Sequence, residues 1–275
     1  MYTYTRRYTG PLQAVIMDLA GTCVDFGSLA PIQAFLKLFE AEDIDLSEAE
    51  AREPMGTEKR EHIRRLLAMP RIRKQWQLRF NKAPDDRDID RLYQAFLPLQ
   101  TAAIAERAEL IPGALDLQTL LREEAIAMGV NTGYSREMVE VMLPRLHAQG
   151  FEPASVVVAT EVPQGRPAPH MSLKNAIELG VTAVQACVKV DDTATGIEEG
   201  LNAGMWTVAV VASGNAIGLG EDELAALDDA DRARRLADGH RVMAASGAHY
   251  VIDSIADLPE VLVDIDHRLA AGEQP

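Results

Sequence analysis

The sequence predicts an α/β fold, a doubly wound parallel-sheet (Rossmann-like) core with an inserted α-helical cap domain. Short apolar runs alternate with helical patterns from residue 111 onward, which is typical of a parallel sheet covered by helices on both faces. A further apolar run at residues 14–18 stands apart, and the helical segment that follows it is too long to be a loop. We therefore expect residues 1–28 and 107–275 to form the core domain and residues 29–106 to form the cap.

The first strand and the helical segment have clear boundary signals. Ala14 to Asp18 is an apolar run that ends in a carboxylate, followed by a turn of small residues. In the helical segment, Pro31 suits an early helical position, and Ser47 with Glu50 has the spacing of a capping box. Pro54-Met55-Gly56 interrupts the segment, a charged helix is expected from Thr57 to about Met69, and turns are expected at Pro70 and at Pro84-Asp85-Asp86.

The second half of the chain supplies the remaining strands and helices. Strands are expected at residues 126–131, 155–160, 186–190, 206–211 and 249–252, and helices at 114–124, 171–179, 196–203 and from 254 onward. Ser135 is expected to cap the helix after the second strand. Residues 220–240 form an acidic, then basic, helical surface without recognisable chemistry.

Bulk composition restricts the possible functions. Hydrophobic residues make up 47% of the 275 residues, and the net charge of −15 argues against nucleic acid or an anionic membrane as a partner. Cys23 and Cys187 lie in or beside apolar runs, so we expect two reduced, buried thiols. The N-terminal residues lack a secretory signal, and no apolar run approaches the ~20 residues of a membrane span, so we expect a cytoplasmic protein.

Three predicted strands end in polar residues. Asp18 ends the first, Thr132 follows the second, and Asp191-Asp192 follow the strand that contains Cys187. The carboxyl ends of parallel strands meet at one edge of the sheet, where such folds bind ligands. The loop around Arg166 lies between the last two strands and adds a fixed cation. Each residue alone is explained as a turn or cap residue, but the four in this order point to one site.

In this combination the chain resembles the haloacid dehalogenase superfamily. The resemblance implies that Asp18 is the nucleophile, that Thr132 and Arg166 bind the phosphoryl group, and that Asp192 helps to hold Mg²⁺. A carboxylate can attack phosphorus, and a cation bound by hard oxygen ligands would reduce the repulsion between the two anions. In ordinary phosphatases of this superfamily an acid stands at position 20, where this chain has Ala20. Either the site is a crippled phosphatase or the leaving group is handled in another way.

Lys59 offers that other way. The chain has six lysines against 21 arginines, and only a lysine can act as an amine nucleophile. Arg60, Arg64 and Arg65 would favour the neutral amine if they lie close to it in space. His62 would share a helical face with Lys59 and transfer protons during imine formation. The alternative is that Lys59 and His62 are ordinary residues of a solvated, charged helix.

A closer resemblance, from about residue 12 to near the C-terminus, is to the phosphonoacetaldehyde hydrolase family. It is carried by these segments: Asp18-Leu19-Ala20-Gly21-Thr22, Pro54-Met55-Gly56 with Lys59 and His62, Met69-Pro70-Arg71-Ile72, Thr132-Gly133-Tyr134, Gly165-Arg166-Pro167 and Ala203-Gly204-Met205-Trp206-Thr207-Val208. It implies a Schiff base on Lys59, an aspartyl-phosphate on Asp18, a homodimer and a place in 2-aminoethylphosphonate degradation.

The same resemblance assigns further site residues. The carbonyl oxygen of Ala20 would be a third magnesium ligand beside Asp18 and Asp192, and Met55 and Tyr134 would line the site or serve only in packing. The usual later acid of the superfamily, four residues after Asp192, is replaced here by Gly196. Asp191 could substitute for it, directly or through a water molecule; we expect Asp192 to be the direct ligand and Asp191 to lie outside the ligand shell. The rival hypotheses are a magnesium-dependent phosphate-ester phosphatase and a non-catalytic phosphate-binding relative.

Overall fold

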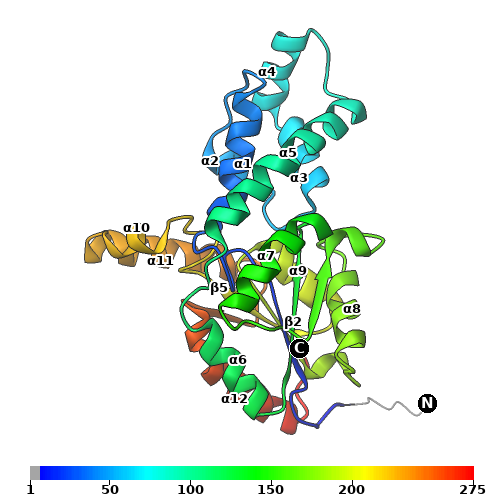
Figure 1. Ribbon diagram of the computed structural model, residues 1–275. Coiled ribbons are helices and arrows are strands. Elements are labelled where there is room, and N and C mark those ends of the chain that lie inside the picture. The colour runs from blue at the N-terminus through cyan, green and yellow to red at the C-terminus, as the bar shows by residue number, and fades with distance from the viewer. Residues whose placement is uncertain (1–6) are drawn as a thin grey trace, which may run out of the picture.

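The computed structural model describes residues 7–275, and its centre is a six-stranded parallel sheet (Figure 1). The strands are β1 (Ala14–Met17), β2 (Ala127–Thr132), β3 (Ser155–Val158), β4 (Cys187–Asp191), β5 (Trp206–Val210) and β6 (Tyr250–Ile252). Their order across the sheet is β3-β2-β1-β4-β5-β6, so β1 lies in the middle and pairs with both β2 and β4. The predicted α/β class and parallel sheet are confirmed.

Helices bury both faces of this sheet, as the nearly continuous apolar strands require. On β1, Val15 and Met17 face one hydrophobic cluster while Ala14 and Ile16 face another, because successive side chains of a strand point to opposite faces. The face with Val15 and Met17 is covered by α6 (Ala114–Glu123), α7 (Arg136–Ala148) and α12 (Leu258–Ala270). The face with Ala14 and Ile16 is covered by α8 (His170–Glu178) and α9 (Ala194–Ala203). Beside β5 and β6, the same face is covered by α10 (Glu221–Ala225) and α11 (Asp229–Ala244).

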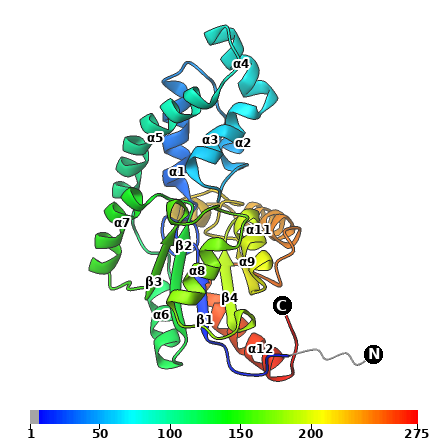
Figure 2. The ribbon, with the colours of Figure 1, turned by 90° about the vertical axis from the view of Figure 1, so that its right-hand side faces the viewer.

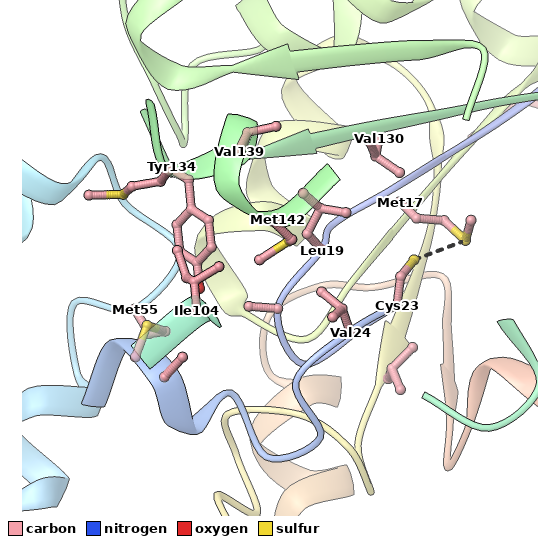
Figure 3. Packing of buried hydrophobic residues seen from close by; sticks show 14 of the residues in the cluster. Met17, Leu19, Cys23, Val24, Met55, Ile104, Val130, Tyr134, Val139 and Met142 are labelled. Carbon is pink, nitrogen blue, oxygen red and sulfur yellow. Dashed lines mark hydrogen bonds between the residues drawn. The ribbon is translucent and has the colours of Figure 1, made fainter. Parts of the chain in front are cut away.

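Of the six helices between β1 and β2, the first five form a separate block above the carboxyl ends of the strands (Figures 1 and 2). They are α1 (Leu29–Glu40), α2 (Glu48–Arg52), α3 (Lys59–Ala68), α4 (Pro70–Phe80) and α5 (Asp86–Arg107). We refer to α1–α5 and their connections as the helical block. Its apolar residues continue into the core cluster: Met55 and Ile104 belong to the same cluster as Tyr134 and Met142 of the core (Figure 3).

The two connections between the helical block and the core lie side by side. Val24, on the way into the block, pairs with Leu110, on the way out, in an antiparallel bridge. The backbone N–H of Asp25 donates to the Glu109 carbonyl at 3.1 Å, and that of Ile111 donates to the Cys23 carbonyl at 2.8 Å. The chain therefore leaves the core and returns to it at one place.

Most sequence-predicted elements are present, with ends that differ by one or a few residues. Ser47 and Glu50 form the expected capping box on α2. Ser135 stands at the N-cap of α7, but its side chain makes no capping hydrogen bond, so that expectation is wrong. The turn expected at Pro70 lies at Met69 instead, since proline suits the first position of α4.

Short 3₁₀ helices also occur at three places: Ala159–Glu161 follows β3, Val184–Ala186 precedes β4, and Ile255–Asp257 precedes α12. Cys23 and Cys187 are free and buried, as expected, and the Cys23 thiol contacts the Met17 sulfur (Figure 3). Among residues 7–275, no helix combines the length and apolar character needed to cross a membrane.

Candidate active site

Three neighbouring strands deliver their polar end residues to one edge of the sheet. Asp18 directly follows β1, Thr132 is the last residue of β2, and Asp191 is the last residue of β4. The backbone N–H of Asp18 still donates to the Val190 carbonyl, at 2.9 Å, so the sheet pairing fixes where its side chain begins. All of these side chains are buried. The predicted meeting of strand ends is present in the structure.

Arg166 joins these groups from its loop. Its Nη2 donates to Asp18 Oδ1 at 2.7 Å and to Asn131 Oδ1 at 2.6 Å, and its Nε donates to Glu199 Oε2 at 2.9 Å. Burial alone would lower the pKa of the guanidinium, but the charges of Asp18, Asp191 and Glu199 outweigh burial and raise that pKa. Arg166 therefore stays cationic and holds the Asp18 carboxylate in a fixed orientation.

The three aspartates form a group that can bind a cation. One carboxylate oxygen from each of Asp18, Asp191 and Asp192 lies within 4.8 Å of the others. Asp191 already has polar partners within the protein: its Oδ1 accepts from the Thr193 N–H at 3.0 Å, and its Oδ2 lies 3.0 Å from Lys189 Nζ. Asp192 accepts only from the Thr22 hydroxyl and the Asn215 N–H and, within residues 7–275, pairs with no cation.

The charges of this group fit a bound divalent cation. Burial, followed by repulsion from Asp18 and Asp191, raises the pKa of Asp192 well above its usual range. Burial would raise the pKa of Asp191 too, but Arg166 and Lys189 outweigh it and lower that pKa. The site thus contains three aspartates and a buried glutamate against one arginine and two lysines, Lys189 and Lys59. A divalent cation at Asp18 and Asp192 would offset the excess negative charge.

Lys59 approaches the same site from the helical block. It is the first residue of α3, its side chain is 3% exposed, and its Nζ lies 5.2 Å from the centre of the Tyr134 ring and 5.8 Å from that of Phe35. Burial lowers the pKa of the amine to about 8, although Asp18 and Glu58 oppose this. An amine with that pKa is neutral in about a tenth of the molecules at pH 7, far more than an unperturbed lysine.

The arginines near Lys59 in sequence do not produce this shift. Arg60 pairs with Asp90 at 2.7 Å, Arg64 pairs with Asp86 at 2.9 Å, and Arg65 pairs with Glu61, all on the outer side of the helical block. The expectation that they favour the neutral amine is wrong. Their charges are neutralised locally, and loss of hydration around Lys59 has the effect instead.

His62 is buried rather than solvated. Its ring stacks on Phe35 with centroids 3.9 Å apart, and its Nε2 bonds the Ala51 carbonyl at 2.9 Å, so Nε2 carries the proton. Burial, with a further contribution from Lys59, lowers the pKa of His62 well below its usual value. Its Nδ1 has no hydrogen-bond partner. His62 is thus a neutral imidazole with a free acceptor atom, one helical turn from Lys59.

The remaining predicted residues line a small cavity between the helical block and the core. Asp18, Ala20, Lys59, Thr132 and Arg166 contribute to its wall, and Met55 and Tyr134 also line it. Its volume is about 20 Å³, which is room for about one water molecule. Residues of both the helical block and the core form the wall of this cavity.

Sequence reasoning missed three buried residues behind the site. Lys189 donates to Asn131 Oδ1 at 2.7 Å, and Glu199 accepts from the Ser172 N–H at 2.9 Å as well as from Arg166. The signal for Lys189 was present, because a lysine in the middle of the apolar run Cys-Val-Lys-Val must find a buried partner. Glu199 lies on α9 and Asn131 on β2, and no local pattern marks either.

Comparisons with known proteins agree with this geometry. Residues 12–204 match the family of haloacid dehalogenase-like hydrolases. A phosphonoacetaldehyde hydrolase of Hahella chejuensis is 52% identical over 274 residues, covering 100% of this chain and 93% of the relative. The phosphonoacetaldehyde hydrolase of Vibrio parahaemolyticus is 48% identical over 267 residues, covering 96% and 98%. A crystal structure from Oleispira antarctica, described as a phosphonoacetaldehyde hydrolase-like protein, has a TM-score of 0.98 at 48% identity and covers 100% of both chains.

Proposed function

Because the chain belongs to the haloacid dehalogenase-like hydrolases, and among them to the phosphonoacetaldehyde hydrolases, we propose that it uses Lys59 and Asp18 as two successive nucleophiles. The overall reaction is hydrolysis of the P–C bond of phosphonoacetaldehyde to phosphate and acetaldehyde. The observation that carries the mechanism is the position of Lys59. It is a buried amine, with its pKa lowered to about 8, in the wall of the cavity that contains Asp18.

In the first step the neutral Lys59 amine attacks the aldehyde carbon, and loss of water gives an imine. Protonated, that imine is an iminium that can accept the electron pair of the P–C bond as it breaks. The free Nδ1 of His62 supports a role in accepting a proton from the attacking amine and returning it to the leaving hydroxyl. This explains why a neutral imidazole is held one turn from the amine.

In the second step an Asp18 oxygen attacks phosphorus. The P–C bond breaks, its electrons pass to the iminium, and the products on the protein are an aspartyl-phosphate and an enamine. We propose that Arg166 and the Thr132 hydroxyl, which both line the cavity, donate to the phosphoryl oxygens. Because the carbon leaves as an enamine and not as an alkoxide, no acid is needed at position 20, which is consistent with Ala20.

In the last steps water hydrolyses the aspartyl-phosphate, the enamine carbon takes up a proton, and hydrolysis of the imine releases acetaldehyde and the Lys59 amine. We propose Mg²⁺ as the cation, held by Asp18, Asp192 and the carbonyl oxygen of Ala20, with Asp191 outside the ligand shell. Bound there, the ion supplies charge neutralisation between the Asp18 carboxylate and the phosphoryl group. The occupied oxygens of Asp191 support its outer position.

The test is release of phosphate and acetaldehyde from phosphonoacetaldehyde with Mg²⁺, with and without borohydride. We expect both products, and inactivation when borohydride reduces the imine during turnover, with the added mass on the peptide containing Lys59. Lys59→Arg should abolish both, whereas Lys37→Arg, at an exposed position of α1, should change neither. Appreciable hydrolysis by Lys59→Arg would contradict the imine.

The same assay tests the rival hypotheses. Turnover of ordinary phosphate esters that is indifferent to the loss of Lys59 would indicate a phosphatase, and phosphate-analogue binding without turnover would indicate a binding protein. We also propose that residues 29–106 act as a cap that closes over the core formed by 1–28 and 107–275. A cytoplasmic homodimer acting in 2-aminoethylphosphonate degradation remains a prediction from the resemblance.

A further inference from the structure

Arg52 connects the helical block to the part of the core that follows β5. It is the last residue of α2, and its Nη1 donates to the Gly27 carbonyl and to Asn215 Oδ1, both at 3.1 Å. Its Nη2 donates to the Gly218 carbonyl at 3.0 Å. Asn215 Nδ2 donates back to the Arg52 carbonyl at 3.3 Å. We call this reciprocal arrangement the Arg52–Asn215 contact.

The acceptors of Arg52 are all neutral. Within residues 7–275 the guanidinium forms no ion pair with a carboxylate, whereas Arg64 and Arg71 of the same block both do. A partly buried charge without a direct ion pair loses hydration, and well-placed neutral acceptors offset part of that loss. The contact is therefore favourable only when the helical block is fully docked.

Asn215 extends the contact to the metal-binding group. While its side chain bonds Arg52, its backbone N–H donates to Asp192 Oδ2 at 2.8 Å. Asp192 is the carboxylate without a cationic partner in the described part of the chain. One residue of the loop after β5 thus joins the helical block and the proposed metal ligand.

The core is shaped to receive the guanidinium. Gly218 has φ = +65°, and a Cβ at this position would lie 2.6 Å from both Cζ and Nε of Arg52. A side chain here would be strained in its backbone and would also displace the guanidinium.

The contact lies close to the residues that close the cavity. Three residues after Arg52, the Met55 carbonyl accepts from the Thr195 hydroxyl at 3.0 Å. A Cβ on Gly56 would lie 2.4 Å from the hydroxyl oxygens of Thr193 and Thr195, so the block and the core are in close contact here. Lys59 follows at the start of α3, and the cavity beneath it holds about 20 Å³.

From this geometry we propose that Arg52 and Asn215 are positioning residues that hold the helical block closed and align Lys59 with Asp18 and Asp192. The proposal rests on the proposed function, in which both groups act on one substrate. Opening for substrate entry breaks the Arg52–Asn215 contact, and closure re-forms it. Because Asn215 also bonds Asp192, closure and metal binding are energetically coupled and each favours the other.

A distance measurement tests the proposal without substrate. Leu78 on α4 and Ile177 on α8 are 78% and 79% exposed, and the native cysteines are buried, so Leu78→Cys with Ile177→Cys accepts two spin labels. We expect Arg52→Ala to shift the label–label distances toward longer values in the presence of Mg²⁺. Asn215→Ala should do the same, and the double variant should add little to either. Arg64→Ala, which removes ion pairs only within the block, should leave the distances unchanged.

Substrate and metal titrations complete the test. Arg52→Ala should lower kcat/KM about tenfold or more and weaken Mg²⁺ binding to the substrate-free protein, and Arg52→Lys should recover only part. Gly218→Ala should reproduce the Arg52→Ala distances although it retains the arginine. Unchanged distances and Mg²⁺ affinity in Arg52→Ala, with only a lower melting temperature, would reduce Arg52 to a structural role and overturn the proposal. The distance measurements need no substrate, so they test the positioning role separately from the reaction. If Arg52→Ala shifts the distances but the wild-type protein releases no acetaldehyde, the proposed function is contradicted and the positioning role is not.

Discussion

The carboxylate of Asp191 occupies the space in which a side chain of residue 196 would lie. A Cβ on Gly196 would be 2.0 Å from both Cγ and Oδ2 of Asp191. Only glycine at 196 therefore permits the position in which Asp191 contacts Arg166 and Lys189. The absence of an acid at position 196 and the presence of one at position 191 are therefore linked. The carboxylate that fills the space beside residue 196 comes from Asp191 at the end of β4, and not from a side chain on α9.

This relationship predicts that Gly196→Ala destabilises the protein by about 1–3 kcal/mol and lowers kcat at least tenfold, because Asp191 must move away from Arg166. Asp191→Gly should be more harmful, about 3–5 kcal/mol, since Lys189 loses a buried partner. The combined variant Asp191→Gly/Gly196→Asp, which places the carboxylate on the helix, should be more active than either single variant. Chemical denaturation and steady-state rates measure this, and a double variant no better than Asp191→Gly would argue against the exchange.

The lowered pKa of Lys59 predicts a pH dependence of imine formation. Burial sets that pKa at about 8, so the rate of borohydride trapping should rise with pH and level off above about pH 8. Stability gives a check on the assignment. Between pH 8 and the unfolded value of 10.5 the unfolded chain binds more protons at Lys59 than the folded chain, so folding becomes more favourable as pH rises. Relative to Lys59→Met, the wild-type free energy of unfolding should therefore increase across this window. A flat difference would assign the pKa to another group.

Restoring an acid at position 20 should not improve the reaction. Ala20 borders the small cavity beside Asp18, and a carboxylate there would join a group that already has excess negative charge. We expect Ala20→Asp to lower kcat/KM for phosphonoacetaldehyde, with Ala20→Ser as the control for added volume. A large gain in P–C cleavage by Ala20→Asp would show that the leaving group does need an acid.

Removing the metal should destabilise the protein through repulsion among the aspartates. We expect Mg²⁺ to raise the melting temperature by about 2–4 °C for each kcal/mol of binding free energy gained. Asp192→Asn should raise the melting temperature of the metal-free protein, because burial disfavours the Asp192 carboxylate and the variant removes it, and should abolish most of the Mg²⁺ effect. An Asp192→Asn protein that keeps the full Mg²⁺ shift would place the ion elsewhere.

The sequence predicted those parts of the site that depend on strand ends. Asp18, Thr132 and Asp192 follow apolar runs, and parallel pairing brings such ends together whatever the remaining details are. The fold class and the insertion after the first strand follow from the same patterning.

What the sequence did not predict depends on contacts between distant residues. Arg52 and Asn215 are separated by 163 residues, and nothing in their neighbourhoods marks a pair. The wrong role for Arg60, Arg64 and Arg65 has the same origin. Nearness in sequence on a helix does not tell which face carries the ion pairs and which is buried.

The bridge between Val24 and Leu110 makes the helical block an exchangeable unit. Because the chain leaves and re-enters the core at adjacent positions, a different insert of any size could begin and end there without disturbing the order of the six strands. The proposed phosphoryl chemistry of Asp18 belongs to the sheet, whereas the amine proposed to bind the aldehyde belongs to the insert. The junction is therefore the place at which a different helical insert could be grafted onto the same sheet.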